Sequence, residues 1–266
     1  MKDLKDFTVS IAREAGALLK SRFSHRHTID FKGEIDIVTE ADRLSEDLLV
    51  KRISNAFPHH DILAEESAAT ERGARSRWII DPLDGTTNYA HGFPVFCVSI
   101  ALEEQGLVEL GVIYNPMMDE IFVAQRGQEA TLNGCTLKVS DTTALGHSLL
   151  ATGFPYDIRV NPDNNIAYFI EMALRARAIR RAGSAALDLA YVAAGRFDGF
   201  WELRLHPWDI AAGQLLVREA GGCVTDIEGN DFTLDAPVIV ASNSKIHHEM
   251  TDVLKGTNPR YGIPCR

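Results

Sequence analysis

Apolar residues near the start of the chain recur at steps of three and four positions, the spacing of one face of an α-helix. The first such set is Leu4, Phe7, Ile11, Ala15, Leu18 and Phe23, and the second is Leu44, Leu48 and Phe57. We therefore expect two amphipathic helices near the start. The segment between them, residues 28–38, is typical of extended chain.

From residue 95 to residue 139 the pattern changes to short apolar runs separated by turn-forming residues. These separators are Glu104-Gln105-Gly106, Asn115-Pro116, Arg126-Gly127 and Asn133-Gly134. Such punctuation indicates a meander of antiparallel strands. The first half of the chain, residues 1–145, is therefore predicted to be α+β.

The second half, residues 146–266, alternates between the two kinds of element, which favours an α/β arrangement. We expect extended segments at residues 149–152, 197–203, 223–226 and 238–241. Helices are expected at residues 165–177, 184–194 and 207–220, and at 244–254 after a serine cap. No flexible linker marks the boundary near residue 145.

Composition and charge exclude several classes of protein. The chain has 266 residues, 27 basic and 37 acidic, giving a formal charge of −10. A broad nucleic-acid groove would need a basic surplus, so direct nucleic-acid binding is not expected. The four cysteines show no paired spacing, and the first residues are charged instead of apolar. We therefore expect a reduced, cytoplasmic protein without a membrane span.

The most informative stretch follows an apolar segment that ends at Asp81. Pro82 bends the chain, and Asp84 returns to the same side three residues later, so the two carboxylates could share a cation. Gly85 and Thr86 follow where a helix could begin and offer N–H groups to a phosphate. Alternatively, Asp84 caps that helix and Asp81 forms a turn. A metal partner is favoured because Asp81 leaves a buried strand, where an unpaired charge is costly.

Three further acidic motifs are ambiguous when taken alone. Glu65-Glu66 follows a short apolar segment, and only one of the two can face a shared site, unless both are surface charges. Asp209 lies behind Pro207 in the first turn of a predicted helix, where the macrodipole favours an acid without any metal. Thr39-Glu40-Ala41-Asp42 matches a capping box.

Together these motifs resemble the inositol monophosphatase family of magnesium-dependent, lithium-sensitive phosphatases, across nearly the whole chain. Residues 81–88 are similar to the first signature of that family, and residues 208–213 with 219–222 are similar to the second. Residues 183–199 and the context of Glu202 are most similar to the bacterial extragenic-suppressor type. The resemblance implies the layered αβαβα sandwich of the inositol monophosphatase and fructose-1,6-bisphosphatase type, and a homodimer.

The resemblance also implies a role for each motif residue, with two to three Mg²⁺ ions per site. Glu65, Asp81 and the Leu83 carbonyl would hold one ion, and Asp81, Asp84 and Asp209 another. Asp42 and Thr86 would orient the attacking water, while Gly85 and Thr86 would offer amides to the phosphate. The implied substrate contacts are Asp84, Gly183, Ser184, Ala185, Glu202 and Asp209.

The expected reaction is hydrolysis of a small polyol or sugar monophosphate, most of all myo-inositol monophosphate, to the free polyol and phosphate. Two local departures stand out: Arg204 replaces a glycine of many relatives, and the stretch between Lys32 and Asp36 is one residue shorter than in animal members. A related phosphatase, acting on fructose 1,6-bisphosphate, histidinol phosphate or a 3′-phosphonucleotide, is the competing enzyme. The resemblance also leaves open a regulatory protein, because some bacterial relatives join transcription complexes with RNA polymerase and antitermination factors.

Overall fold

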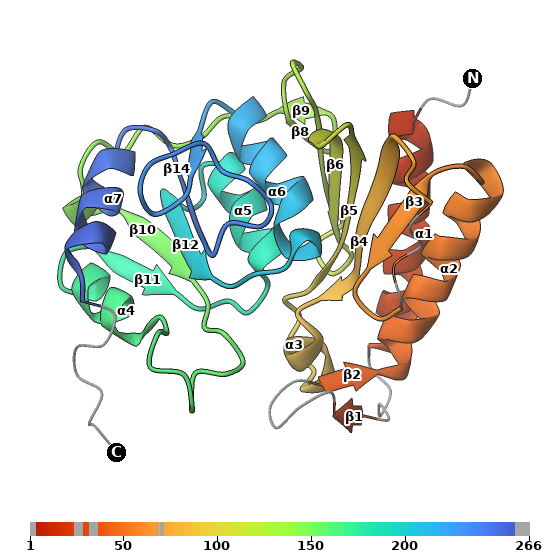
Figure 1. Cartoon of the computed structure of the whole chain (residues 1–266), viewed down its shortest axis with the longest axis horizontal. Coiled ribbons are helices and arrows are strands. Elements are labelled where there is room, and N and C mark those ends of the chain that lie inside the picture. Colours follow the sequence, from red (N-terminus) through yellow and green to blue (C-terminus); the bar gives the residue numbers. More distant parts are fainter. Residues whose placement is uncertain (1–3, 24–28, 32–36, 68, 70–71, 259–266) are drawn as a thin grey trace.

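Helices and sheets alternate in five layers (Figure 1). The computed structural model describes residues 4–23, 29–31, 37–67, 69 and 72–258. From the N-terminal side the layers are a helix pair, a seven-stranded sheet, a second helix pair, a five-stranded sheet and an outer helix pair. The predicted αβαβα sandwich is confirmed.

The first layer consists of α1 (Leu4–Arg22) and α2 (Glu40–Ala56), which confirms the two helices predicted from apolar spacing. Their buried faces pack on the seven-stranded sheet. Strands β1 (Ile29–Phe31) and β2 (Ile37–Thr39) pair antiparallel within the stretch predicted to be extended. Lys32 and Asp36 lie outside the described residues.

The seven-stranded sheet contains the predicted meander, with its strands in sequence order. Its members are β3 (Asp61–Ala64), β4 (Ser76–Asp84), β5 (Cys97–Glu104), β6 (Leu107–Asn115), β7 (Glu120–Gln125), β8 (Thr131–Leu132) and β9 (Cys135–Thr136). Strands β3 and β4 are parallel, and the later pairs are antiparallel. Short helix α3 (Thr86–Ala90) follows β4 at the edge where the site forms.

The central helices α5 (Ala185–Ala193) and α6 (Pro207–Glu219) lie between the two sheets and contact both. The five-stranded sheet has the order β11-β10-β12-β14-β13. Its strands are β10 (Leu149–Thr152), β11 (Ala178–Arg180), β12 (Gly199–Leu203), β13 (Cys223–Thr225) and β14 (Val238–Ser242). The largest core cluster fills the space around α5 and α6, so both halves of the chain share one core.

The outer layer shows where local sequence signals were wrong. Helix α4 (Ile166–Ala173) stops before residue 177, because β11 begins at Ala178 and pairs parallel with β10. Helix α7 (His247–Gly256) begins after Ile246, so the predicted serine cap is wrong. Ser244 instead has a positive φ of 69°, and the Asn243 side chain accepts hydrogen bonds from the Lys245 and Ile246 N–H groups.

The two sheets divide near the 3-10 turn η1 (Leu145–His147), with the seven-stranded sheet before it and the five-stranded sheet after it. A division into two domains at this point stays a prediction. Within the described residues, no helix combines the length and apolar character needed to cross a bilayer.

Candidate active site

The acidic residues after β3 and β4 lie at one edge of the seven-stranded sheet. The two strands are parallel, with Ala64 opposite Ile80, so Glu65 and Asp81 follow at adjacent positions. Side chains alternate along β4: Trp78 and Ile80 belong to the core under α1 and α2, and Ile79 belongs to the central core. Continuing this alternation directs Asp81 toward the central helices.

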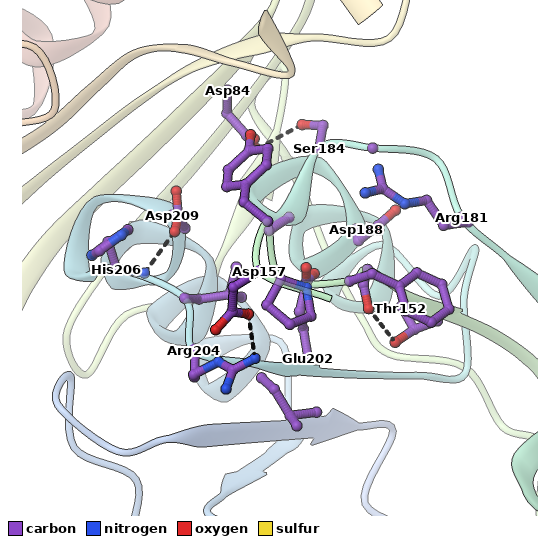
Figure 2. Close-up of a pocket in the computed structure, with 18 residues that line it drawn as sticks. Asp84, Thr152, Asp157, Arg181, Ser184, Asp188, Glu202, Arg204, His206 and Asp209 are labelled. Carbon is purple, nitrogen blue, oxygen red and sulfur yellow. Dashed lines mark hydrogen bonds and ion pairs between the residues drawn. The ribbon is translucent and has the colours of Figure 1, made fainter. Parts of the chain in front are cut away.

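Asp84 links the end of β4 to the start of α5. Its Oδ2 accepts hydrogen bonds from the Ser184 hydroxyl and from the Ala186 N–H, each 2.7 Å long. Ser184 is also the N-cap of α5, where its hydroxyl accepts from Leu187 N. The Asp84 carboxylate therefore joins the two halves of the chain at the site (Figure 2).

Asp209 reaches the same site from the first turn of α6. Its Oδ2 accepts a 2.7 Å hydrogen bond from His206 N, the contact expected of an acid at this position. Helix α6 begins with Pro207, which fixes the direction in which Asp209 emerges. Asp209 therefore stabilises the start of α6 and also belongs to the acidic cluster.

Burial raises the pKa of the acidic side chains, and the charges of neighbouring acids add to this for Asp81 and Asp209. Burial raises the pKa of Asp81 well above its ordinary range, and the charge of Glu65 is the next largest cause. The pKa of Asp209 is raised in the same way, first by burial and then by the charge of Asp84. Burial also raises the pKa of Asp84, against the hydrogen bond from Ser184. Such a cluster favours a positive charge among its members.

The donor set suits a hard cation that prefers oxygen ligands. Within the described part of the chain, no three His, Cys, Asp or Glu side chains are grouped tightly enough to hold a metal ion as they stand. Their oxygens instead accept nearby N–H groups, as Asp81 Oδ1 does from Leu83 N at 2.9 Å. Burial and the repulsion between the acids both disfavour the charged carboxylates, and a divalent cation would offset both effects, so the residues fit magnesium chemically.

Asp42 and Thr86 meet beside this cluster. The Thr86 hydroxyl donates to Asp42 Oδ1 at 2.8 Å, while Thr39 N donates to Asp42 Oδ2 at 2.8 Å. The predicted capping box is therefore present, and the same carboxylate also holds Thr86. Burial raises the pKa of Asp42, against the hydrogen bonds from the two threonines.

Gly85 occupies a position that only glycine fits. Its φ is 98°, and a Cβ there would lie 2.9 Å from the Val95 carbonyl oxygen and 3.2 Å from the Gly183 carbonyl oxygen. The backbone therefore turns sharply between Asp84 and Thr86. This turn places the Gly85 and Thr86 amides at the start of α3.

A cavity of about 440 Å³ opens next to Asp84 and Asp209. All six residues predicted to contact the substrate line it: Asp84, Gly183, Ser184, Ala185, Glu202 and Asp209. The other predicted site residues lie outside its lining: Asp42, Glu65, Asp81, Leu83, Gly85 and Thr86.

Glu202 reaches the cavity from β12. A Cβ at Gly153 would lie 2.0 Å from Glu202 Oε1, so glycine at position 153 makes room for this carboxyl group. Burial raises the pKa of Glu202 to about 8, against the charge of Arg181.

Comparison with known proteins decides the family. The model of the inositol monophosphatase family matches residues 1–255. The chain belongs to this family. The predicted relationship is thereby confirmed, and the inositol monophosphatase family is one of phosphoric monoester hydrolases.

Individual relatives of the inositol monophosphatase family match over almost their whole length. An inositol-1-monophosphatase of Mesorhizobium japonicum is 44% identical over 95% of this chain and 96% of its own. A protein of Pseudomonas aeruginosa named Nus factor SuhB is 45% identical over 92% of this chain and 93% of its own. The solved inositol monophosphatase of Anabaena (Nostoc) superposes with a TM-score of 0.88 at 44% identity, covering 96% of each chain.

Several residues of the cavity were missed by the sequence analysis. Arg204, recorded there only as a departure from other members of the family, has a positive φ of 55° and pairs with Asp157 at 2.6 Å on the cavity wall. Arg181 and Asp188 also line the cavity. A signal existed for Asp188, because it is the single charged residue in the apolar helix α5.

Proposed function

We propose that this member of the inositol monophosphatase family is a magnesium-dependent phosphatase for a small polyol or sugar monophosphate. Myo-inositol monophosphate is the substrate that we favour, with the free polyol and inorganic phosphate as products. The observation that carries the proposal is the position of Asp84. Its carboxylate belongs to the acidic cluster and also lies on the wall of the cavity, hydrogen-bonded to Ser184.

The acidic cluster would hold the cations. Glu65, Asp81 and the Leu83 carbonyl would bind one magnesium ion, and Asp84 and Asp209 would bind a second together with Asp81. Bound magnesium would supply positive charge to the phosphate and the leaving oxygen, and would lower the pKa of water. Asp81 contributes to both positions because it lies between β3 and the central helices, where the charges of Glu65, Asp84 and Asp209 all act on it.

Asp42 and Thr86 would act as the general base. The Thr86 hydroxyl has one proton, with Asp42 Oδ1 as the nearer acceptor at 2.8 Å and the Leu83 carbonyl oxygen as the farther one at 3.1 Å. Its lone pairs could take a proton from the attacking water while its own proton passes to Asp42. Asp42 in turn is held by Thr39 through two hydrogen bonds, so the direction of the relay is fixed. The Gly85 and Thr86 amides would hold the phosphate.

The far wall of the cavity would bind the polyol. Ser184 and Ala185 begin α5 beside Asp84, and Glu202 faces the cavity from the neighbouring strand. A carboxyl group here would form hydrogen bonds with hydroxyl groups of the substrate and take no part in the phosphorus chemistry. The cavity volume of about 440 Å³ is in the range of sites for small molecules.

The deciding experiment is turnover of a panel of inositol, sugar and nucleotide monophosphates, with a sugar bisphosphate and histidinol phosphate included. Each is measured with magnesium and after its removal by a chelator, and scored by kcat/KM. Magnesium-dependent hydrolysis with inositol or sugar monophosphates ranked first supports the proposal. A higher kcat/KM for a nucleotide, a bisphosphate or histidinol phosphate would contradict the proposed substrate and favour one of the related phosphatase activities.

A second function deserves a parallel test because relatives at 41–45% identity are named Nus factor SuhB. The same chain could bind proteins of the transcription machinery. Purified RNA polymerase and antitermination factors, tested for binding to the wild-type protein and to a variant without turnover, separate the two roles. Binding by both proteins, with no substrate turned over by the wild type, would favour the regulatory function alone.

A further inference from the structure

A buried acid outside the predicted site lies on the wall of the cavity. Helix α5 reads Ala-Ala-Leu-Asp-Leu-Ala-Tyr-Val-Ala, and Asp188 is its single charged residue. The side chain is only 1% exposed, in a helix that is otherwise part of the central core. Acidic residues are almost never buried to this degree unless a partner group accompanies them.

Asp188 has no such partner on one of its oxygens. Its Oδ1 is buried and makes no hydrogen bond within the described residues. This contrasts with Asp198, a buried acid of the same type, which accepts from the Ser140 hydroxyl at 2.5 Å and from Leu149 N at 2.7 Å. A buried polar atom without a partner costs stability, and native proteins rarely keep one without a use.

The cavity contains the groups that act on this carboxyl. Figure 2 shows Asp188 between Arg181 and Glu202, on the side of the cavity away from His206. Burial raises the pKa of Asp188 well above its ordinary range, the charge of Glu202 raises it further, and Arg181 lowers it. Two carboxyl groups and one guanidinium therefore form this part of the wall.

This composition selects the chemistry of the ligand. A hydroxyl group can donate to an ionised carboxylate or accept from a protonated one, so it satisfies Oδ1 in either state. The raised pKa values of Asp188 and Glu202 make both kinds of hydrogen bond available to such a hydroxyl group. The wall suits adjacent hydroxyl groups on an uncharged part of the substrate.

We propose that Asp188 is a further specificity-determining residue, which binds one ring hydroxyl of the substrate next to the hydroxyl held by Glu202. The inference rests on the proposed phosphatase function and narrows it to monophosphates of polyhydroxylated compounds. A substrate analogue without this hydroxyl would leave the Asp188 carboxyl unpaired. Loss of such a buried hydrogen bond is the kind of difference by which a site rejects an analogue most strongly.

The test combines two variants with altered substrates. Asp188→Leu removes both the charge and the hydrogen bond, whereas Asp188→Asn keeps a polar group of the same shape. Each is assayed with myo-inositol 1-phosphate, with its monodeoxy analogues and with a small aryl phosphate. For the wild type, removing the hydroxyl held by Asp188 should lower kcat/KM about 10- to 100-fold, mostly through KM. In Asp188→Leu the substrate and the deoxy analogue that lacks this hydroxyl should have the same kcat/KM, while the other deoxy analogues should behave as with the wild type.

Asp188→Asn should keep part of the hydroxyl preference, because the amide still offers a hydrogen-bonding group of the same shape. Comparing the two variants therefore separates loss of the hydrogen bond from loss of the carboxyl group.

Asp198→Asn is the matched control for a merely structural acid. It should lower the melting temperature without changing the order of the substrates, whereas Asp188→Leu should not lower it, since it removes an unsatisfied buried carboxyl. Equal losses on inositol phosphate and on every deoxy analogue would overturn the inference and leave the phosphatase proposal standing. A wild-type protein that hydrolyses the aryl phosphate but no polyol phosphate would overturn both.

Discussion

The Thr86 hydroxyl donates a 2.8 Å hydrogen bond to Asp42 Oδ1, joining two residues that are 44 positions apart in the chain. Each residue also has a local role, because Asp42 completes the capping box of α2 and Thr86 begins α3. The contact exists because α3 follows β4 at the sheet edge next to the start of α2. A pair held in this way can work as one unit.

We expect Asp42→Asn and Thr86→Val to lower kcat by about 10² to 10⁴, the usual range for one general base. The double variant should be little worse than the poorer single variant, because the two groups share one proton relay. Magnesium affinity should change much less, since neither residue is a proposed ligand. Turnover and calorimetric titration with magnesium measure both quantities.

Two variants serve as controls for this pair. Thr86→Ser keeps the hydroxyl and should retain most of the activity, while Thr87→Val alters the exposed neighbour and should have no effect. Strictly additive losses in the double variant, or full activity of Thr86→Val, would show that another group activates the water.

Asp209→Asn should abolish turnover and leave the fold intact. The amide oxygen can still accept the hydrogen bond from His206 N, but the charge proposed for the second magnesium ion is lost. Wild-type protein should gain about 2.7 kcal/mol of stability from magnesium at 100 times its dissociation constant. The variant should gain clearly less. Thermal unfolding with and without magnesium, together with turnover, checks both expectations.

Asp141→Asn is a suitable control, because Asp141 is an exposed acid that pairs with Lys245 away from the cavity. It should respond to magnesium like the wild type. Near-normal kcat of Asp209→Asn at saturating magnesium would remove Asp209 from the metal site, and a collapsed melting transition would make its role structural.

The helices and strands were largely predictable because their signals are local. Apolar spacing gave α1 and α2, and the turn-forming pairs gave the meander from β5 to β9. The strand β11 was missed, since its three residues directly follow the predicted helix and are extended through their pairing with β10. The predicted Ser244 cap was wrong because the Asn243 side chain accepts the hydrogen bonds from the Lys245 and Ile246 N–H groups before α7.

The site could be predicted only in part from the residues themselves. Spacing favoured Asp81 and Asp84, but it left Asp42 and Asp209 as ordinary helix starts, and both local roles are present in the structure. Their grouping depends on packing between distant segments, so it required the family resemblance. Asp188 gave a sequence signal that was not used, since a charge inside an apolar helix is unusual.

Glu202→Gln should act mainly on substrate choice. The carboxyl group lines the cavity, and as a group that accepts hydroxyl hydrogen bonds it contributes to binding instead of the phosphorus chemistry. KM for inositol or sugar phosphates should rise about 10-fold, as expected for the loss of one buried hydrogen bond. A small aryl phosphate should be barely affected. Equal losses on both kinds of substrate, measured as kcat/KM, would contradict this role.

His247 should make the stability of the protein depend on pH. Its ring is 9% exposed, with Nε2 placed 2.9 Å from the Thr225 hydroxyl and Nδ1 placed 2.9 Å from the Ser242 hydroxyl. The Thr225 hydroxyl donates to the Asp226 carbonyl, so it must accept from Nε2–H, which leaves Nδ1 as an acceptor for Ser242. The network thus fits the neutral ring, and burial lowers the pKa of His247 to about 4.

The sign of this dependence follows from the two states of His247. The unfolded chain protonates the ring near its ordinary pKa of 6.5, whereas the folded protein holds it neutral down to about 4. Above pH 6.5 the free energy of unfolding therefore receives the full contribution of His247. This contribution decreases as the pH falls from 6.5 to 4, by a total on the order of 2 to 3 kcal/mol.

The test is chemical unfolding of wild type and His247→Gln across this pH range, in which the variant should show a smaller decrease in the free energy of unfolding. His248→Gln, which alters the exposed neighbouring histidine, should keep the wild-type slope. An identical slope for wild type and His247→Gln would mean that the ring is not held neutral in the fold, and that carboxylates alone set the acid sensitivity.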